Sequence, residues 1–260
     1  MKKTNWKKIG YEALKGGGQI LAAFAFLVSL WWAAYLLADN ELVVPALSDC
    51  AKQAWRMLGK AWFWQAFSRT FSRVLLSFFL SFVLAAIFAV ISYLLPAFAK
   101  FFAPIVAALR SLPVLAVSLI LIIWFGAGGA PIVVAFLSLF PMLYTGIFAA
   151  LSSVDKQLID VGRACGVTVK NNVFRVYVPL AAPYVTREAT AAFSFALKLV
   201  VSAEVVANTA RSLGGLMQEA QGYLELPKLF ALVIVTFFVA LVLETVGNWL
   251  VSCVDFNKVK

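Results

Sequence analysis

Histidine, cysteine and charge are scarce in this sequence. Its 260 residues contain no His and three Cys, and only 13% are Asp, Glu, Lys or Arg. Cys50, Cys165 and Cys253 lie far apart, so no zinc-site or disulfide spacing is present. The phosphate-binding pattern G-x-x-x-x-G-K-[ST] is also missing, which argues against ATP hydrolysis by this chain. We therefore expect no metal, no cofactor and no enzymatic activity.

Apolar residues, in contrast, are too abundant for a soluble protein. They make up 63% of the chain, more than the core of a soluble domain of this size can bury. The net charge of +10 does not indicate nucleic-acid binding, because the basic residues are not gathered on one aromatic-rich surface. The composition predicts an all-α integral membrane protein.

The apolar runs predict six membrane-spanning helices, at about 19–38, 71–95, 104–125, 131–150, 183–208 and 229–252. The uncharged run from Ser111 to Val154 has 44 residues, too many for one helix, and the Gly126–Pro131 cluster divides it. Residues 1–18 and 253–260 are then terminal segments of one membrane domain, 19–252. The stretch 209–228 is compatible with either a loop or a re-entrant segment.

A basic amphipathic segment precedes the second span. Over about 46–66, one side carries apolar residues, namely Leu47, Ala51, Trp55, Leu58 and Trp62. Lys52, Arg56 and Lys60 recur on another side, which is typical of an interfacial helix in contact with membrane lipid. An acidic partner or substrate is the alternative ligand of this basic row.

The distribution of Lys and Arg predicts the orientation in the membrane. With the N-terminus inside, the inner segments carry thirteen Lys and Arg residues and the outer segments carry seven. Cytoplasmic loops are enriched in Lys and Arg, so we expect both termini and the segment 153–179 in the cytoplasm.

The segment 153–179 is the longest well-charged stretch after residue 100. Ser153 is a good N-cap for one helix, Gly166 suits its C-terminus, and Pro179 limits a second, shorter helix. The pattern predicts a helical hairpin that either docks a partner or is simply solvated, with its charged residues paired to one another.

This segment resembles the cytoplasmic loop of bacterial ATP-binding-cassette importer permeases. That family's pattern is E-A-A, three residues, G, nine residues and I-x-L-P; here Asp160-Val161-Gly162, Gly166 and Val176-Tyr177-Val178-Pro179 stand at the same spacing. Trp124-Phe125-Gly126, Ser202-Ala203-Glu204 and the run from Ser212 to Met217 resemble the nitrate/sulfonate/taurine class of these permeases.

The resemblance implies a type I importer permease in a bacterial cell membrane. It makes 153–179 a coupling hairpin that docks an ATP-binding subunit, through Lys156, Asp160, Val161, Gly162, Arg163, Gly166, Val176, Val178 and Pro179. The expected partners are two ATP-binding subunits, a second permease as a homodimer, and an external substrate-binding protein. The cargo would be a small solute such as nitrate, a sulfonate, taurine or a vitamin precursor.

Ionisable residues inside spans mark candidate pathway or gate positions. These are Arg110, Lys198 and Glu204, with Glu244 in the last span. A charge in the bilayer costs at least ~2.5–3.5 kcal/mol, so each must face the pathway or pair with a neighbouring helix, as Glu204 could with Arg110. The alternative function is a proton-coupled secondary transporter using Glu204 or Glu244, although no internal repeat supports it.

We expect Gly166→Val to uncouple transport, because a β-branched residue is strongly disfavoured at the positive φ of a helix C-terminus. Membrane insertion should survive, while co-purification of the ATP-binding subunit and substrate-stimulated ATP hydrolysis should fall. Normal transport by this variant would contradict the coupling hairpin.

Overall fold

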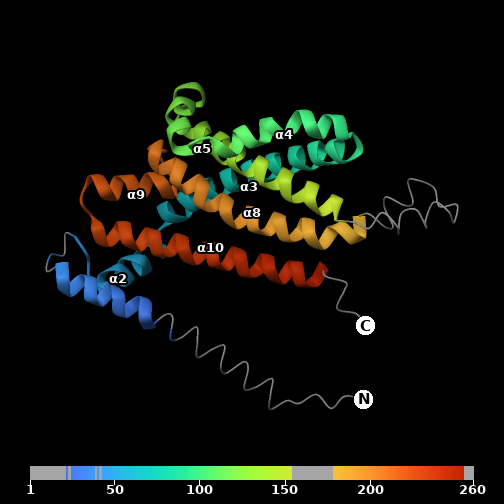
Figure 1. Cartoon of the computed structure of the whole chain (residues 1–260). Coiled ribbons are helices and arrows are strands. Elements are labelled where there is room, and N and C mark those ends of the chain that lie inside the picture. The colour runs from blue at the N-terminus through green and yellow to red at the C-terminus, as the bar shows by residue number, and fades with distance from the viewer. Residues whose placement is uncertain (1–21, 23–24, 39, 41–42, 154–177, 255–260) are drawn as a thin grey trace, which may run out of the picture.

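The computed structural model describes residues 22, 25–38, 40, 43–153 and 178–254. All regular elements in this part of the chain are helices (Figure 1). Four are long and apolar enough to cross a membrane: α3 (Ala61–Leu94), α5 (Val114–Ser152), Leu180–Val206 of α8 and Leu226–Trp249 of α10. The helix Ala25–Ala38 lies within the first predicted span and is shorter. The all-helical membrane fold is confirmed, and the count of six spans stays a prediction.

Helix α3 buries a ridge of mostly small side chains. Its buried residues are Phe63, Ala66, Thr70, Val74, Ser77, Ser81, Ala85, Ala89 and Ser92. Their spacing of three or four residues places them on one side of the helix. Small residues let helix backbones approach closely in a membrane, where apolar side chains gain nothing by leaving lipid. The ridge accordingly packs α3 against α5 and α8.

The predicted amphipathic helix 46–66 is two helices in the structure. Helix α2 covers Leu47–Leu58 and has Gly59 as its C-cap, and Lys60 is extended before α3 begins. Trp62 therefore belongs to α3, which starts well before the predicted position near 71. Within α2, Cys50 and Met57 are buried, whereas Lys52 and Arg56 are exposed, as an interfacial helix requires.

The third predicted span, 104–125, is wrong. Helix α4 covers Pro96–Ser111, and α5 starts at Val114. The break falls at Leu112, which is extended with ψ 129°, because the residue before a proline, here Pro113, disfavours the helical conformation. The predicted division at Gly126–Pro131 is present as a sharp kink at Gly126, where two helical segments of α5 follow one another. Only Gly126 is non-helical there, with φ 68° and ψ 170°. That conformation is accessible essentially to glycine alone.

The C-terminal half forms a helical pair with a short helix at one end. Helix α8 covers Val178–Val206, and α10 covers Leu226–Val254 beside it (Figure 1). Between them α9, Leu213–Gly222, packs against α8, α10 and α3, so 209–228 contains a packed helix. The prediction that Pro179 ends a helix is wrong, because Pro179 lies in the first turn of α8, where a missing N–H costs nothing.

Aromatic side chains and one hydrogen bond join α3, α4 and α5. Phe102 of α4 stacks on Phe88 of α3 with ring centroids 4.9 Å apart, and meets Tyr144 of α5 edge-on at 5.3 Å. The Tyr144 hydroxyl lies 2.8 Å from the Ser92 hydroxyl. This bond pairs two buried polar groups that lipid could not satisfy.

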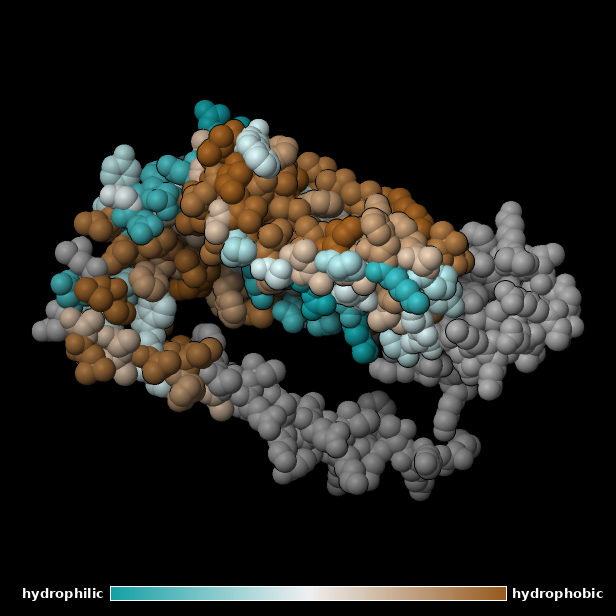
Figure 2. Space-filling model, turned by 45° about the horizontal axis from the view of Figure 1, so that its top comes forward, coloured by the Kyte–Doolittle hydropathy of each residue, from teal (hydrophilic) through white to brown (hydrophobic). Residues whose placement is uncertain are grey.

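The outer surface is largely apolar. Figure 2 shows hydrophobic residues over most of the body of the described helices. On α3 the exposed side opposite the small-residue ridge includes Leu76, Phe79, Val83 and Ile87. An apolar surface of this extent would make a soluble protein aggregate, but it suits contact with lipid tails.

We expect Gly126→Ala to destabilise the chain by about 1–3 kcal/mol, the usual cost of a non-glycine residue in this backbone region. A Cβ at Gly126 meets nothing within 4 Å, so the effect would come from backbone conformation alone. The matched control is Gly128→Ala, which also has open space and lacks a positive φ. Equal thermal stability of the two purified variants would contradict the kink.

Candidate functional site

A fully buried carboxylate lies where four helices meet. Glu204 of α8 is 0% exposed, and donors from two other helices bind both of its oxygens. Arg73 Nη1 of α3 donates to Oε1 over 2.8 Å. Thr70 Oγ1 and the backbone N–H of Gly214 donate to Oε2 over 2.9 and 3.2 Å. These groups, together with the N–H of Leu213, are called the Glu204 cluster below.

The Glu204 cluster continues to the kink of α5. Arg73 Nε donates to the carbonyl of Gly128 over 3.1 Å, and Thr209 Oγ1 donates to the carbonyl of Ala127 over 2.6 Å. In a regular helix the carbonyl of Ala127 would accept from residue 131, but Pro131 has no N–H. Thr209 thus supplies a donor that the helix itself cannot.

The Glu204 cluster also caps the start of α9. The first N–H groups of a helix have no partner within it. Here Leu213 N–H binds Thr70 Oγ1 over 2.9 Å, Gly214 N–H binds Glu204, and Gly215 N–H binds the Ser212 hydroxyl over 3.0 Å. A carboxylate at this end is further favoured by the helix dipole. Two of the three caps come from other helices, so they tie α9 to α3 and α8.

Arg73 is the functional candidate that sequence reasoning missed. By its place in the sequence it counts among the outer loops, and Arg110 is the predicted partner for Glu204. Arg73 instead lies inside α3 with 15% of its side chain exposed, and it forms the ion pair. The sequence does place Arg73 at the edge of a long uncharged run, three residues after Thr70, which indicates a charge close to the membrane. The sequence does not indicate which acidic side chain pairs with Arg73.

The other predicted pathway residues lie away from this cluster. Arg110 near the end of α4 and Lys198 on α8 are exposed, and so is Glu244 on α10. The structure therefore does not bring Arg110 or Lys198 together with Glu204. Their assignment to the pathway, like that of Glu204, stays a prediction.

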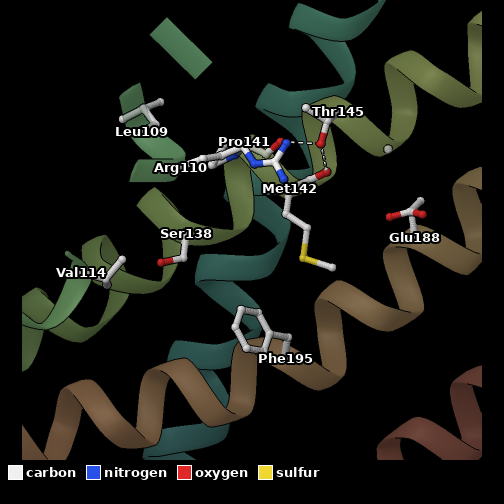
Figure 3. A pocket seen from close by; sticks show the side chains of 10 residues that line it. Leu109, Arg110, Val114, Ser138, Pro141, Met142, Thr145, Glu188 and Phe195 are labelled. Carbon is white, nitrogen blue, oxygen red and sulfur yellow. Dashed lines mark hydrogen bonds between the residues drawn. The ribbon is translucent and has the colours of Figure 1, made fainter. Parts of the chain in front are cut away.

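A pocket of about 410 Å³ lies between α4, α5 and α8. Its polar lining comes from Arg110, Ser138, Thr145 and Glu188, and Figure 3 shows Arg110 extending over α5 toward Thr145, with Glu188 on α8 across the pocket. Phe195 also lines it, and Lys198 follows one turn later on α8. These five polar residues, Arg110, Ser138, Thr145, Glu188 and Lys198, are called the polar face below.

The predicted coupling residues fall mostly outside the described part of the chain. Lys156, Asp160, Val161, Gly162, Arg163, Gly166 and Val176 lie in the segment 154–177, and Val178 and Pro179 begin α8. Among the described residues, no group of three or more His, Cys, Asp or Glu side chains is placed to hold a metal ion.

Comparisons with known proteins all match membrane components of transport systems. A family model described as "Binding-protein-dependent transport system inner membrane component" matches residues 81–258. The riboflavin transport system permease protein RibX of Chloroflexus aurantiacus is 30% identical over 222 residues, 82% of each chain. The taurine transport system permease protein TauC of Escherichia coli is 24% identical, over 86% of this chain and 84% of that protein.

A solved structure shows the same fold. The inward-facing MetNI methionine ABC transporter gives a TM-score of 0.62 at 22% identity, covering 72% of this chain and 93% of that chain. The similarity supports the arrangement of the helices described above.

The close approach of α9 to α8 generates a prediction. A Cβ at Gly214 would contact Glu204 and come within 2.6 Å of the Val205 backbone nitrogen, so Gly214→Ala should displace α9 and cost about 1–3 kcal/mol. In the same helix, a Cβ at Gly222 meets nothing within 4 Å, which makes Gly222→Ala the control. Thermal unfolding of the purified variants would measure both, and a Gly214→Ala protein as stable as the control would refute this packing.

Proposed function

The chain belongs to the family of binding-protein-dependent transport system inner membrane components, the permease subunits of ATP-binding-cassette importers, and from that premise we propose that its polar face forms one wall of the translocation pathway. The observation that carries this proposal is the gathering of charged and hydroxyl side chains around one pocket in a subunit whose exposed surface is largely apolar.

The cost of charge in a bilayer supports this assignment. Arg110 and Lys198 are exposed and Glu188 is half-buried. A charged side chain facing lipid near the bilayer centre costs at least ~2.5–3.5 kcal/mol, so such side chains normally face water or another protein. The polar face is therefore poorly suited to lipid and better suited to water or a protein partner.

A second copy of the chain would cover the polar face. One subunit supplies only one side of the pocket between α4, α5 and α8, and a symmetric partner would supply the opposite wall. We propose a homodimer of permeases in which the two polar faces enclose the pathway. Two ATP-binding subunits would dock on the hairpins 153–179, at the cytoplasmic side given by the excess of Lys and Arg.

The substrate-binding protein would then dock at the opposite end, near α9. Relatives named for riboflavin and for taurine transport support a small organic solute as cargo. The same relatives are named as transport-system permeases, and the structural match is an ABC transporter, so the proton-coupled alternative has no support. A thermal-shift screen of solutes against the binding protein encoded with this permease would identify the cargo.

Cysteine accessibility tests the polar face. We expect Phe195→Cys to react with a water-soluble thiol reagent on the order of tenfold faster than Phe79→Cys, because the reactive thiolate forms in water and not in lipid. Phe195 lines the pocket, whereas Phe79 lies on the apolar side of α3 with similar exposure, 42% against 56%. Both variants would be assayed in membranes containing the full transporter.

The native background is favourable for this experiment. Cys50 is buried, and burial, aided by the nearby charge of Asp49, raises the pKa of its thiol. Cys165 and Cys253 would be replaced by Ser. Equal labelling rates at the two test positions would show that the polar face is not an aqueous surface.

A further inference from the structure

Helix α9 is too short to hold its own position. It has ten residues, and isolated helices of that length are marginally stable at best. Its buried residues are Leu213, Gly214, Gly215, Met217 and Ala220, most of them close to its first turn. The placement of α9 therefore depends on how its start is anchored.

Backbone with positive φ flanks α9 on both sides. In the described part of the chain, the non-glycine residues with positive φ are Asn208 at 48°, Arg211 at 53° and Leu224 at 57°. Two of these precede α9 and one follows it directly. Residues in this region persist only where the surrounding structure enforces the conformation.

The anchors of α9 are the Glu204 cluster. Thr70 and Glu204 accept the N–H groups of Leu213 and Gly214, and Arg73 neutralises the carboxylate while binding the kink of α5. Thr70 is 0% exposed and its hydroxyl both donates to Glu204 and accepts from Leu213. Loss of any of these side chains leaves a buried donor or a buried charge without its partner.

Helix α9 also lies at the end of the exposed side of α8. Along that side, Phe195, Lys198 and Ser202 are exposed in successive turns, and exposed Asn208 and Arg211 follow immediately before α9. On the topology proposed above, this is the outer end of the polar face. The element that the Glu204 cluster anchors is therefore the one that follows α8 at this end.

We propose that α9 is a latched outer seal of the translocation pathway, and that Arg73, Thr70 and Glu204 are the positioning residues that keep it closed on the bundle. The proposal rests on the proposed function for the identity of the pathway. The latch itself concerns only the attachment of α9 to α3 and α8.

A buried reporter on α9 tests the latch. Ala220 is 0% exposed, so Ala220→Cys, in a chain whose native cysteines are replaced by Ser, should react slowly with a membrane-impermeant maleimide. Thr70→Val keeps the shape of the side chain and removes the hydroxyl. We expect it to raise the labelling rate of the reporter thiol in membranes by about tenfold or more through local opening of α9.

A matched control separates this effect from the loss of any threonine hydroxyl. Thr186 is on α8, and among the described residues its hydroxyl donates to the carbonyl of Ala182 in its own helix over 2.7 Å. Thr186→Val should therefore leave the reporter thiol on α9 protected. Co-purification of the ATP-binding subunit with each variant would confirm that the transporter assembles.

The double variant Arg73→Gln with Glu204→Gln provides a second, charge-neutral test. Single changes leave one buried charge uncompensated and are expected to impair assembly, whereas the double change removes both charges. We expect the double variant to assemble and its reporter thiol to be labelled faster than that of the control. If an assembled Thr70→Val or double variant is labelled at the rate of Thr186→Val, the cluster only stabilises the bundle and the latch is overturned.

The labelling also distinguishes failure of the latch from failure of the proposed function. Faster labelling from the outside supports the seal. Faster labelling that occurs only from the cytoplasmic side would leave the latch intact and refute the proposed orientation, and with it the role of α9 at the outer mouth. Failure of both variants to assemble, with Thr186→Val intact, would overturn a latch that opens locally, since the cluster would then be required for folding.

Discussion

A carboxylate buried among apolar helices is the constraint on which this structure depends. Uncompensated, the charge of Glu204 would cost several kcal/mol, so its donors must be present whenever the helices pack. Those donors come from α3 and α9, and Arg73 reaches on to the carbonyl of Gly128 in α5. The hydrogen-bonding requirement of one side chain thereby specifies how four helices lie. Apolar packing is less specific, because helices with similar apolar surfaces can shift slightly against one another without losing a hydrogen bond.

The irregular backbone near this charge follows the same logic. Gly126 interrupts α5 and Pro131 removes the donor for the Ala127 carbonyl, which would be costly in lipid. Thr209 supplies the missing bond from the connection between α8 and α9. The carbonyls that follow the break, those of Ala127 and Gly128, therefore receive side-chain donors from Thr209 and Arg73. The same region holds the connection between α8 and α9 in a defined position.

The surface of the subunit divides into two kinds of face. The side of α3 with Phe79 is apolar and suits lipid, whereas the polar face carries charges that lipid would not accommodate. This asymmetry agrees with the proposed function, in which one side of the permease faces the membrane and the other faces a partner and the solute. The Glu204 cluster links α3, which carries the apolar side, to α5 and α8, which contribute to the polar face.

Sequence alone determined the membrane class, the family and the break at Gly126, but not the start of α3 or the boundary between α4 and α5. The three features that it determined follow from local information: hydrophobic run length, the conformational freedom of glycine, and motif spacing. It also singled out Glu204, because a charge in an apolar run is visible without a structure. Only the tertiary structure decided that its partner is Arg73, 131 residues away, and that Gly214 must lack a side chain. Periodicity shows which side of a helix is apolar, but it carries no information about which distant group meets a buried charge.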